Sequence, residues 1–159
     1  AAARGLQGFV ASSPHVRLAE MVNDPWGGCI SLTGEAQAAA HAWYAENRMP
    51  VFAWSSLSRG FFSGRFTADE IRAMPENAEL EFVHWYRSEA NLTRLERTFE
   101  LADKKGVTVP QLATAYVLRL PMNLFALVGC LNPGEIASLD KAFDIALSDD
   151  EMAFLDLRG

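Results

Sequence analysis

A turn with two glycines follows an apolar segment and is a candidate site for a phosphate group. The apolar segment is Val51–Ser55, and the turn after it runs from Arg59 to Gly64, with glycine at both Gly60 and Gly64. Parallel α/β proteins bind ligands outside the carboxyl ends of their strands, which is where this turn is expected. Its glycine spacing matches neither a Rossmann nor a P-loop fingerprint. The alternative, a turn that only needs positive φ angles, therefore stays open.

Two further features could contact a ligand at the same edge. Trp54 lies at the end of the apolar segment. It is either a buried core residue, the usual place for tryptophan, or a flat indole at the mouth of a site that stacks on an aromatic ring. The run from Gly129 to Pro133 joins an apolar segment to a helix start, whose free amides suit an anion. Simple helix capping is the plainer interpretation of that run.

The histidines and cysteines form no metal or redox motif. His15, His41 and His84 are irregularly spaced, and Cys29 and Cys130 lie far apart. Only His15, directly after an expected strand, is placed to approach a ligand. His84 lies in a long connection, where binding lids occur, although packing of that connection is simpler. No serine lies in a nucleophile elbow, so no Ser-His-Asp site is expected. The spacing of the histidines and cysteines predicts no metal site.

Composition limits the classes of partner and the location. A net charge of −6 and a pI near 5.0 argue against nucleic acid and against an anionic membrane. No apolar run approaches the roughly 20 residues that span a bilayer, and the thiols suit a reducing compartment, so a cytoplasmic location is expected. At 159 residues, one domain covering residues 1–159 is expected. The chain opens on what looks like the end of a helix, closed by Gly5, which suggests a fragment.

Apolar segments alternate with amphipathic stretches along the chain, which predicts an α/β fold. Strands are expected at Phe9–Ser13, Val51–Ser55 and Leu124–Val128. Because these runs show no polar alternation, we expect parallel strands, buried on both faces and joined by helical crossovers. Helices are expected over residues 34–47, with Ala36, Ala39, Ala40, Trp43 and Tyr44 on one face, over 91–105, and after cap residues Thr67, Thr108, Asn132 and Ser148.

Three such strands would leave a sheet with two open edges. Open edges favour pairing with another chain. A closed eight-stranded barrel takes about 250 residues, which is more than this chain has.

Three stretches, in this order and spacing, resemble the last third of an aldo-keto reductase barrel. They are the runs from Met49 to Gly60, from Gly106 to Leu118 and from Leu127 to Pro133. The resemblance covers nearly the whole chain and implies a partial TIM (β/α)8 barrel, comprising about the last three βα units. It also implies NAD(P)H as cofactor and carbonyl reduction by hydride transfer.

The resemblance assigns cofactor-binding roles to the turn after the second expected strand. Trp54 matches the aromatic residue that stacks on the nicotinamide. Ser55, Leu57, Arg59 and Gly60 match the loop that runs along the pyrophosphate.

Further positions carry over from the other two strands. Ser12 falls near a polar residue that contacts the nicotinamide amide, and Gly129, Cys130 and Asn132 match the loop that takes the adenosine phosphate. Glu135 stands where the family commonly has an arginine that binds the extra phosphate of NADP. A carboxylate there would repel that phosphate, so NAD is favoured over NADP.

Two departures bear on activity. Ser138 and Leu139 stand where a Glu-Asn pair of the family often holds adenine. The family's proton-donating tyrosine, with its aspartate, lysine and histidine partners, belongs to the first four strands, which have no counterpart here. No residue of this chain is therefore assigned a catalytic role, because hydride transfer to a carbonyl also needs an acid for the developing alkoxide.

Three functions remain open. The first is the cofactor-binding part of an NAD(P)H-dependent aldo-keto reductase, inactive alone, so whether the chain is itself an enzyme stays uncertain. The second is a non-catalytic half-barrel that associates with a missing N-terminal half, or with itself, through its open sheet edges. The third is a cofactor-binding module without chemistry. Expected partners are a nicotinamide cofactor and such a half-barrel, with no nucleic acid and no membrane.

Overall fold

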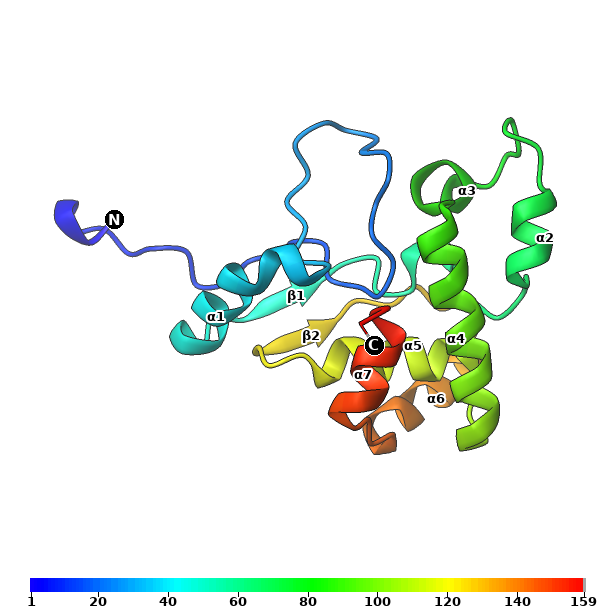
Figure 1. Cartoon of the computed structure of the whole chain (residues 1–159). Helices are drawn as coiled ribbons and strands as arrows, with labels where there is room; N and C mark the ends of the chain where they lie inside the picture. Colours follow the sequence, from blue (N-terminus) through cyan, green and yellow to red (C-terminus); the bar gives the residue numbers. More distant parts are fainter. Residues whose placement is uncertain (159) are drawn as a thin grey trace.

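Two short parallel strands lie at the centre of the chain, with helices packed beside them (Figure 1). The computed structural model describes residues 1–158. The strands are β1 (Val51–Ala53) and β2 (Leu124–Ala126), paired in register from Val51 opposite Leu124 to Ala53 opposite Ala126. The α-helices in these residues are α1 (Ala38–Asn47), α2 (Ala68–Ala73), α3 (Glu81–Tyr86), α4 (Glu89–Lys105), α5 (Val109–Arg119), α6 (Pro133–Asp140) and α7 (Asp149–Leu155).

The expected first strand, Phe9–Ser13, is wrong as a regular strand. Only Ser12 pairs with β1: its N–H donates to Pro50 O at 2.9 Å, and Phe52 N–H donates to Ser12 O at 2.9 Å. Phe9 is 94% exposed rather than buried. No strand lies along its other side among residues 1–158, so these apolar side chains have no surface to cover. The three segments still follow the expected parallel order, with Ser12 beside β1 and β1 beside β2.

The other two strands are shorter than predicted but lie where expected. Val51–Ser55 becomes β1 and ends at Ala53, because Ser55 has a φ of 57° and leaves the extended conformation. Leu124–Val128 becomes β2 and ends at Ala126. The prediction that the strands are buried on both faces of the sheet is also wrong. Helix α5 packs beside β2, whereas Phe52 and Phe125 on the opposite face are exposed by 38% and 47%.

The predicted helix starts are confirmed by their caps. Thr67, Thr108 and Ser148 each form a complete capping box, and the Asn132 side chain accepts from Glu135 N–H. Gly106 closes α4 with a φ of 66°, the left-handed conformation that favours glycine. These signals are local in sequence, which is why they could be recognised without the fold.

Helix α3 was not predicted, whereas α1 was. Leu80 gives α3 no side-chain cap, so α3 depends on packing of its aromatic residues, with Phe82 against Phe61 at a ring distance of 6.1 Å. Helix α1 has no fully buried residue, and Trp43 lies exposed on it. Ala40 and Tyr44 of α1 are partly buried against the core, and Tyr44 O–H also donates to Ser12 Oγ at 2.9 Å.

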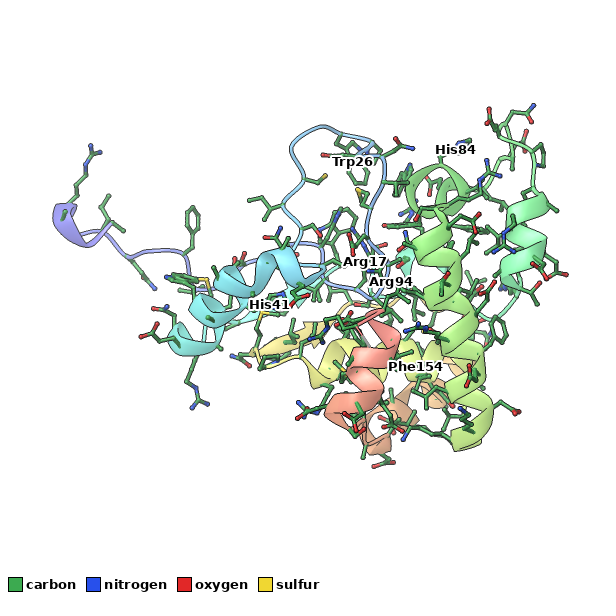
Figure 2. The ribbon with its side chains drawn as sticks, in the orientation of Figure 1. Arg17, Trp26, His41, His84, Arg94 and Phe154 are labelled. Atoms are coloured by element: carbon green, nitrogen blue, oxygen red, sulfur yellow. The ribbon has the colours of Figure 1, made fainter. Side chains whose placement is uncertain are left out.

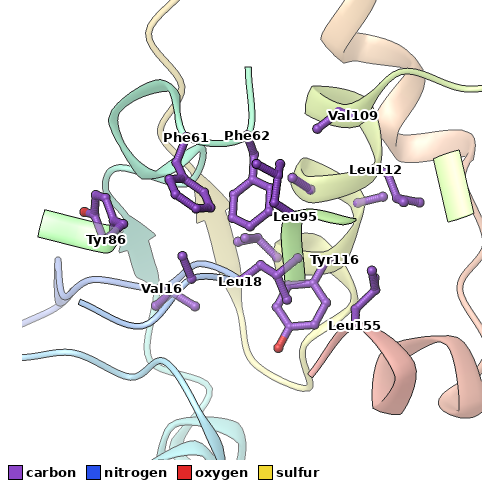
Figure 3. Packing of buried hydrophobic residues seen from close by; sticks show 14 of the residues in the cluster. Val16, Leu18, Phe61, Phe62, Tyr86, Leu95, Val109, Leu112, Tyr116 and Leu155 are labelled. Carbon is purple, nitrogen blue, oxygen red and sulfur yellow. The ribbon is translucent and has the colours of Figure 1, made fainter. Parts of the chain in front are cut away.

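One hydrophobic core joins the helices to the segment before α1. Figure 3 shows Phe61 and Phe62, from the turn after β1, packed among Val16, Leu18, Tyr86 and Leu95. Burial of large apolar side chains is the main favourable term in folding. Since Phe61 and Phe62 are part of this core, they fix the end of the turn that follows β1.

Candidate functional site

The turns after β1 and β2 begin side by side. The two strands are parallel and in register, so both end at one edge of the sheet, and Leu127 N–H donates to Ala53 O at 2.9 Å just beyond that edge. Ligands of parallel α/β folds bind outside this edge. The predicted site residues of the two turns are therefore brought to a common side of the molecule. Ser12 is the exception, because it pairs with Val51 at the start of β1.

Trp54 follows β1 directly and is contacted by two other rings. Its indole meets the imidazole of His15 at a centroid distance of 3.5 Å and an angle of 70°, and it meets Trp26 at 5.5 Å. Trp26 also packs against Trp85 at 5.3 Å. Trp54 is half-buried. The strand that was expected to precede His15 does not form, but an isolated bridge pairs His15 with Trp54, so its ring lies beside the residue expected to stack on a ligand.

The imidazole of His15 is held neutral. Burial, followed by the positive charge of Arg17, lowers its pKa to about 4, against a smaller opposing effect of Asp24. Arg17 Nη2 donates to Nδ1 of His15 at 2.5 Å, which requires an unprotonated Nδ1. At neutral pH, His15 thus acts as a hydrogen-bond acceptor beside Trp54.

The turn after β1 is conformationally unusual. Ser55, Ser58 and Arg59 have φ angles of 57°, 52° and 56°, and Gly60 has 95°. Positive φ is uncommon outside glycine and marks strain that packing must hold. The interpretation of this segment as a turn that needs positive φ is confirmed. The hydroxyl of Ser55 is buried and has no hydrogen-bond partner among residues 1–158.

The other two predicted residues of this turn point to protein neighbours. Leu57 packs against the hydrophobic core. The Arg59 guanidinium pairs with Glu81 and lies 5.0 Å from the Trp85 ring, so its charge is already engaged at the surface.

The loop after β2 already holds an anionic group. Glu135 Oε2 accepts from Leu131 N–H at 2.8 Å, and Glu135 Oε1 accepts from Asn132 Nδ2 at 3.1 Å. Gly129 is exposed and Cys130 is partly buried in the same loop. Capping of α6 by Asn132 is confirmed. The loop amide that would suit an external anion is bound by the chain's own carboxylate.

A surface groove of about 460 Å³ connects the first turn to α6. Ser63 and Gly64 form one side, Val109 and Pro110 contribute the start of α5, and Ser138 comes from α6. The groove thus reaches from the turn after β1 to Ser138, and the family resemblance assigned both places to the nicotinamide cofactor.

Ser12, His41 and His84 are engaged in structural hydrogen bonds. Ser12 Oγ accepts from Tyr44, and Nε2 of His41 lies 2.5 Å from Leu32 O. Nε2 of His84 lies 2.8 Å from Ala78 O. Among residues 1–158, no group of three or more His, Cys, Asp or Glu side chains could hold a metal ion. No helix in this part of the chain is long and apolar enough to cross a membrane.

Sequence reasoning missed Arg17 and Tyr86. Figure 2 shows Arg17 in the interior, below the long loop that carries Trp26. Arg17 is 1% exposed, and its guanidinium lies 4.9 Å from the centre of the Tyr86 ring. An arginine within the apolar run from Val16 to Ala19 was a signal that something polar had to be buried.

Comparisons with known proteins agree with the expected family. A family model described as "Aldo/keto reductase family" matches residues 36–157. A solved structure of a thermostable aldo-keto reductase, Tm1743, in complex with the inhibitor epalrestat is similar with a TM-score of 0.60 and 19% identity. The match covers 96% of this chain and 41% of that chain, so this chain spans less than half of the solved one. No curated protein matches. The fold is a partial α/β barrel.

Proposed function

Because the chain belongs to the aldo/keto reductase family, we propose that it forms the cofactor-binding part of an NAD(P)H-dependent carbonyl reductase. The observation that carries this proposal is the shared edge of the parallel sheet, where Trp54 and both predicted cofactor turns begin together. The bound cofactor would supply a hydride to a carbonyl carbon. The residues of this chain would bind and orient it.

The residues at this edge fit an extended dinucleotide in three places. Trp54 would stack on the nicotinamide ring. The turn from Ser55 to Gly60 would run along the pyrophosphate, and its buried Ser55 hydroxyl has a free hydrogen-bonding capacity. The groove between Gly64 and Ser138 would take the adenosine, in keeping with the adenine role that the family gives to the position of Ser138.

Binding requires one rearrangement. Trp26 contacts Trp54 with ring centroids 5.5 Å apart, so we expect Trp26 to move when the nicotinamide stacks on that indole. Trp26 is 61% exposed, and the loop around it contains Gly27 and Gly28 at positive φ with open space around both. Moving it therefore removes little buried surface.

We propose that NAD(H) is preferred over NADP(H). The Glu135 carboxylate lies at the amide of Leu131, at the start of α6. An additional phosphate would meet a like charge there and would compete for the same amide. Calorimetry with both cofactors tests this, and Glu135→Gln is expected to narrow the difference in affinity. A tighter dissociation constant for NADPH in the unaltered chain would contradict the preference.

We propose that the chain alone does not reduce carbonyls. Protonation of the alkoxide needs an exposed acid near the hydride acceptor. Of the three tyrosines, Tyr44 donates to Ser12, and burial raises the pKa of both Tyr86 and Tyr116. NADH oxidation by the purified chain with any aldehyde or ketone would overturn this part.

The binding test uses tryptophan fluorescence. Titration with NADH is expected to quench emission, and Trp54→Ala is expected to abolish most of that quenching. Trp43→Phe is the matched control, because Trp43 lies on α1 and packs against Tyr44, away from the turns. Quenching that persists in Trp54→Ala, or is absent in the unaltered chain, would contradict cofactor binding at this edge.

A second function is favoured by the uncovered face of the sheet. Phe52 and Phe125 stack there with their ring centroids 5.1 Å apart. Leu127 and Val128, which follow β2, are also exposed. In a closed barrel, residues on this face would pack with side chains of the other strands. The chain would then be a half-barrel that binds the complementary strands of such a barrel.

Sedimentation velocity tests this second function. The chain, mixed with a polypeptide that carries the missing strands, is expected to form a complex that Phe125→Ser weakens. A sedimentation coefficient unchanged by that polypeptide would contradict it.

A further inference from the structure

Arg17 is a buried cation without a carboxylate. Its side chain is 1% exposed, and none of the ion pairs between residues 1–158 includes it. Nη2 donates to Nδ1 of His15, but the N–H groups at Nε and Nη1 have no acceptor. Removing a guanidinium from water is unfavourable unless its charge and its donors are matched.

Other polar groups without partners surround it. The hydroxyl of Tyr86, the hydroxyl of Ser55 and Nε2 of His15 are all buried, and none of them has a partner in good hydrogen-bonding geometry among residues 1–158. The two hydroxyls are close together: burial raises the pKa of Tyr86, and the nearby Ser55 hydroxyl is among the groups that lower it in part. Arg17 lies over the Tyr86 ring at 4.9 Å. The imidazole of His15 touches Trp54, the neighbour of Ser55. Native proteins rarely leave so many buried donors together without an acceptor.

We propose that a small oxyanion, a carboxylate or a phosphate group, binds between Arg17, Tyr86 and Ser55. A guanidinium presents paired N–H groups that match the two oxygens of such a group. The hydroxyls of Tyr86 and Ser55 can donate to the same oxygens. One ligand of this class would neutralise the buried charge and satisfy the orphaned donors at once.

The loop from Asp24 to Cys29 supplies an entry route. Its ends are joined by the Asp24 carboxylate, which accepts from Trp26 N–H at 3.0 Å and from Cys29 N–H at 2.7 Å. The exposed Trp26 is the loop residue that contacts Trp54. Displacing this loop would open the side of Trp54 where His15 and Arg17 lie. The site shares Ser55 with the turn proposed to run along the pyrophosphate, but its thermal test uses no cofactor and can therefore fail or succeed separately from dinucleotide binding.

Thermal unfolding of the full chain tests the site. Phosphate and acetate, each compared with chloride at equal ionic strength, are expected to raise Tm in a saturable way. Arg17→Met is expected to lose this response and to be no less stable than the unaltered chain in chloride. Arg65→Met is the control, because Arg65 is exposed, and it is expected to keep the full response.

A second variant guards against misfolding of the first. Tyr86→Phe keeps the ring under Arg17 and removes only the hydroxyl, so it is expected to weaken anion binding about tenfold. Competition between phosphate and NADH shows whether the natural anion is a phosphate of the cofactor or a separate ligand. Either result supports the site. Phosphate that displaces NADH indicates a phosphate of the cofactor, whereas binding of both indicates a separate ligand.

Two results would overturn the proposal. One is a Tm that neither anion raises above its chloride value, which would assign the counter-charge to a carboxylate of another polypeptide segment. The other is an equal anion response in Arg17→Met and in the unaltered chain.

Discussion

His15 and Trp54 meet edge to face with their ring centroids 3.5 Å apart, although they are far apart in the sequence. The backbone of His15 is also fixed, since its N–H donates to Ile30 O at 3.0 Å and its carbonyl accepts from Leu32 N–H at 2.8 Å. One residue thereby links the segment after Ser12, the returning end of the Trp26 loop and the carboxyl end of β1. The orientation of Trp54 depends on this link.

The buried His15 is expected to make stability depend on pH on the acid side. Its folded pKa is lowered to about 4 from an ordinary value of 6.5, so between these pH values only the unfolded chain takes up the proton. Stability is fully present above pH 6.5 and falls as the pH decreases towards 4. Urea unfolding of His15→Gln across this range is expected to show a flatter profile. His84→Gln, at an exposed site, is expected to keep the original slope.

Tyr116→Phe is expected to destabilise the chain by about 1 kcal/mol, because it removes the hydrogen bond that Tyr116 donates to Asp156. Burial, then the nearby Asp156 charge, raises the pKa of Tyr116 well above 10. Above pH 10 the unfolded chain loses this proton and the folded chain keeps it, so stability falls as pH rises. Unfolding curves at pH 8 and 11 check both effects. If Tyr116→Phe lost as much stability between pH 8 and 11 as the unaltered chain, the pH effect assigned to Tyr116 would be contradicted.

Asn91→Ala is expected to cost about 2–4 kcal/mol, since it leaves the buried Tyr86 carbonyl and two backbone groups of Glu20 without their partner. The Asn91 amide donates to Glu20 O and to Tyr86 O, both at 2.7 Å, and its oxygen accepts from Glu20 N–H at 3.0 Å. Chemical denaturation measures the change. Asn123→Ala removes one exposed hydrogen bond and is expected to cost much less. Equal losses in the two variants would show that burial of Asn91 does not matter.

Thr108→Ala is expected to destabilise the chain by about 1 kcal/mol through loss of the α5 cap. The Thr108 hydroxyl accepts from Gln111 N–H, and the Gln111 side chain accepts from Thr108 N–H. Thr108→Ser keeps the hydroxyl and is expected to retain most of the stability. Thermal unfolding of the unaltered chain and of the two variants measures the difference. Equal Tm values for Thr108→Ser and Thr108→Ala would contradict the prediction.

Much of the fold could be predicted from short-range sequence signals. The caps at Thr67, Thr108 and Ser148 are decided by residues three positions apart, and Gly106 by its own backbone freedom. The positions of β1 and β2 followed from apolar runs between turn residues. The first strand could not be judged in this way, because pairing depends on which residues meet β1 in space, and of Phe9–Ser13 only Ser12 does so.

The state of the candidate site depended on longer-range contacts. The sequence singled out Trp54, Arg59 and Glu135, but the rings around Trp54, the pairing of Arg59 with Glu81 and the burial of Arg17 join segments distant in the chain.

The sequence by itself determined the family resemblance, the helix caps and the order of the parallel segments, because these depend on neighbouring residues and on their spacing. Only the tertiary structure decided that Trp26 contacts Trp54 and that Arg17 is enclosed without a counter-charge. Burial and electrostatic pairing depend on what lies within a few ångströms in space, which a linear pattern does not specify.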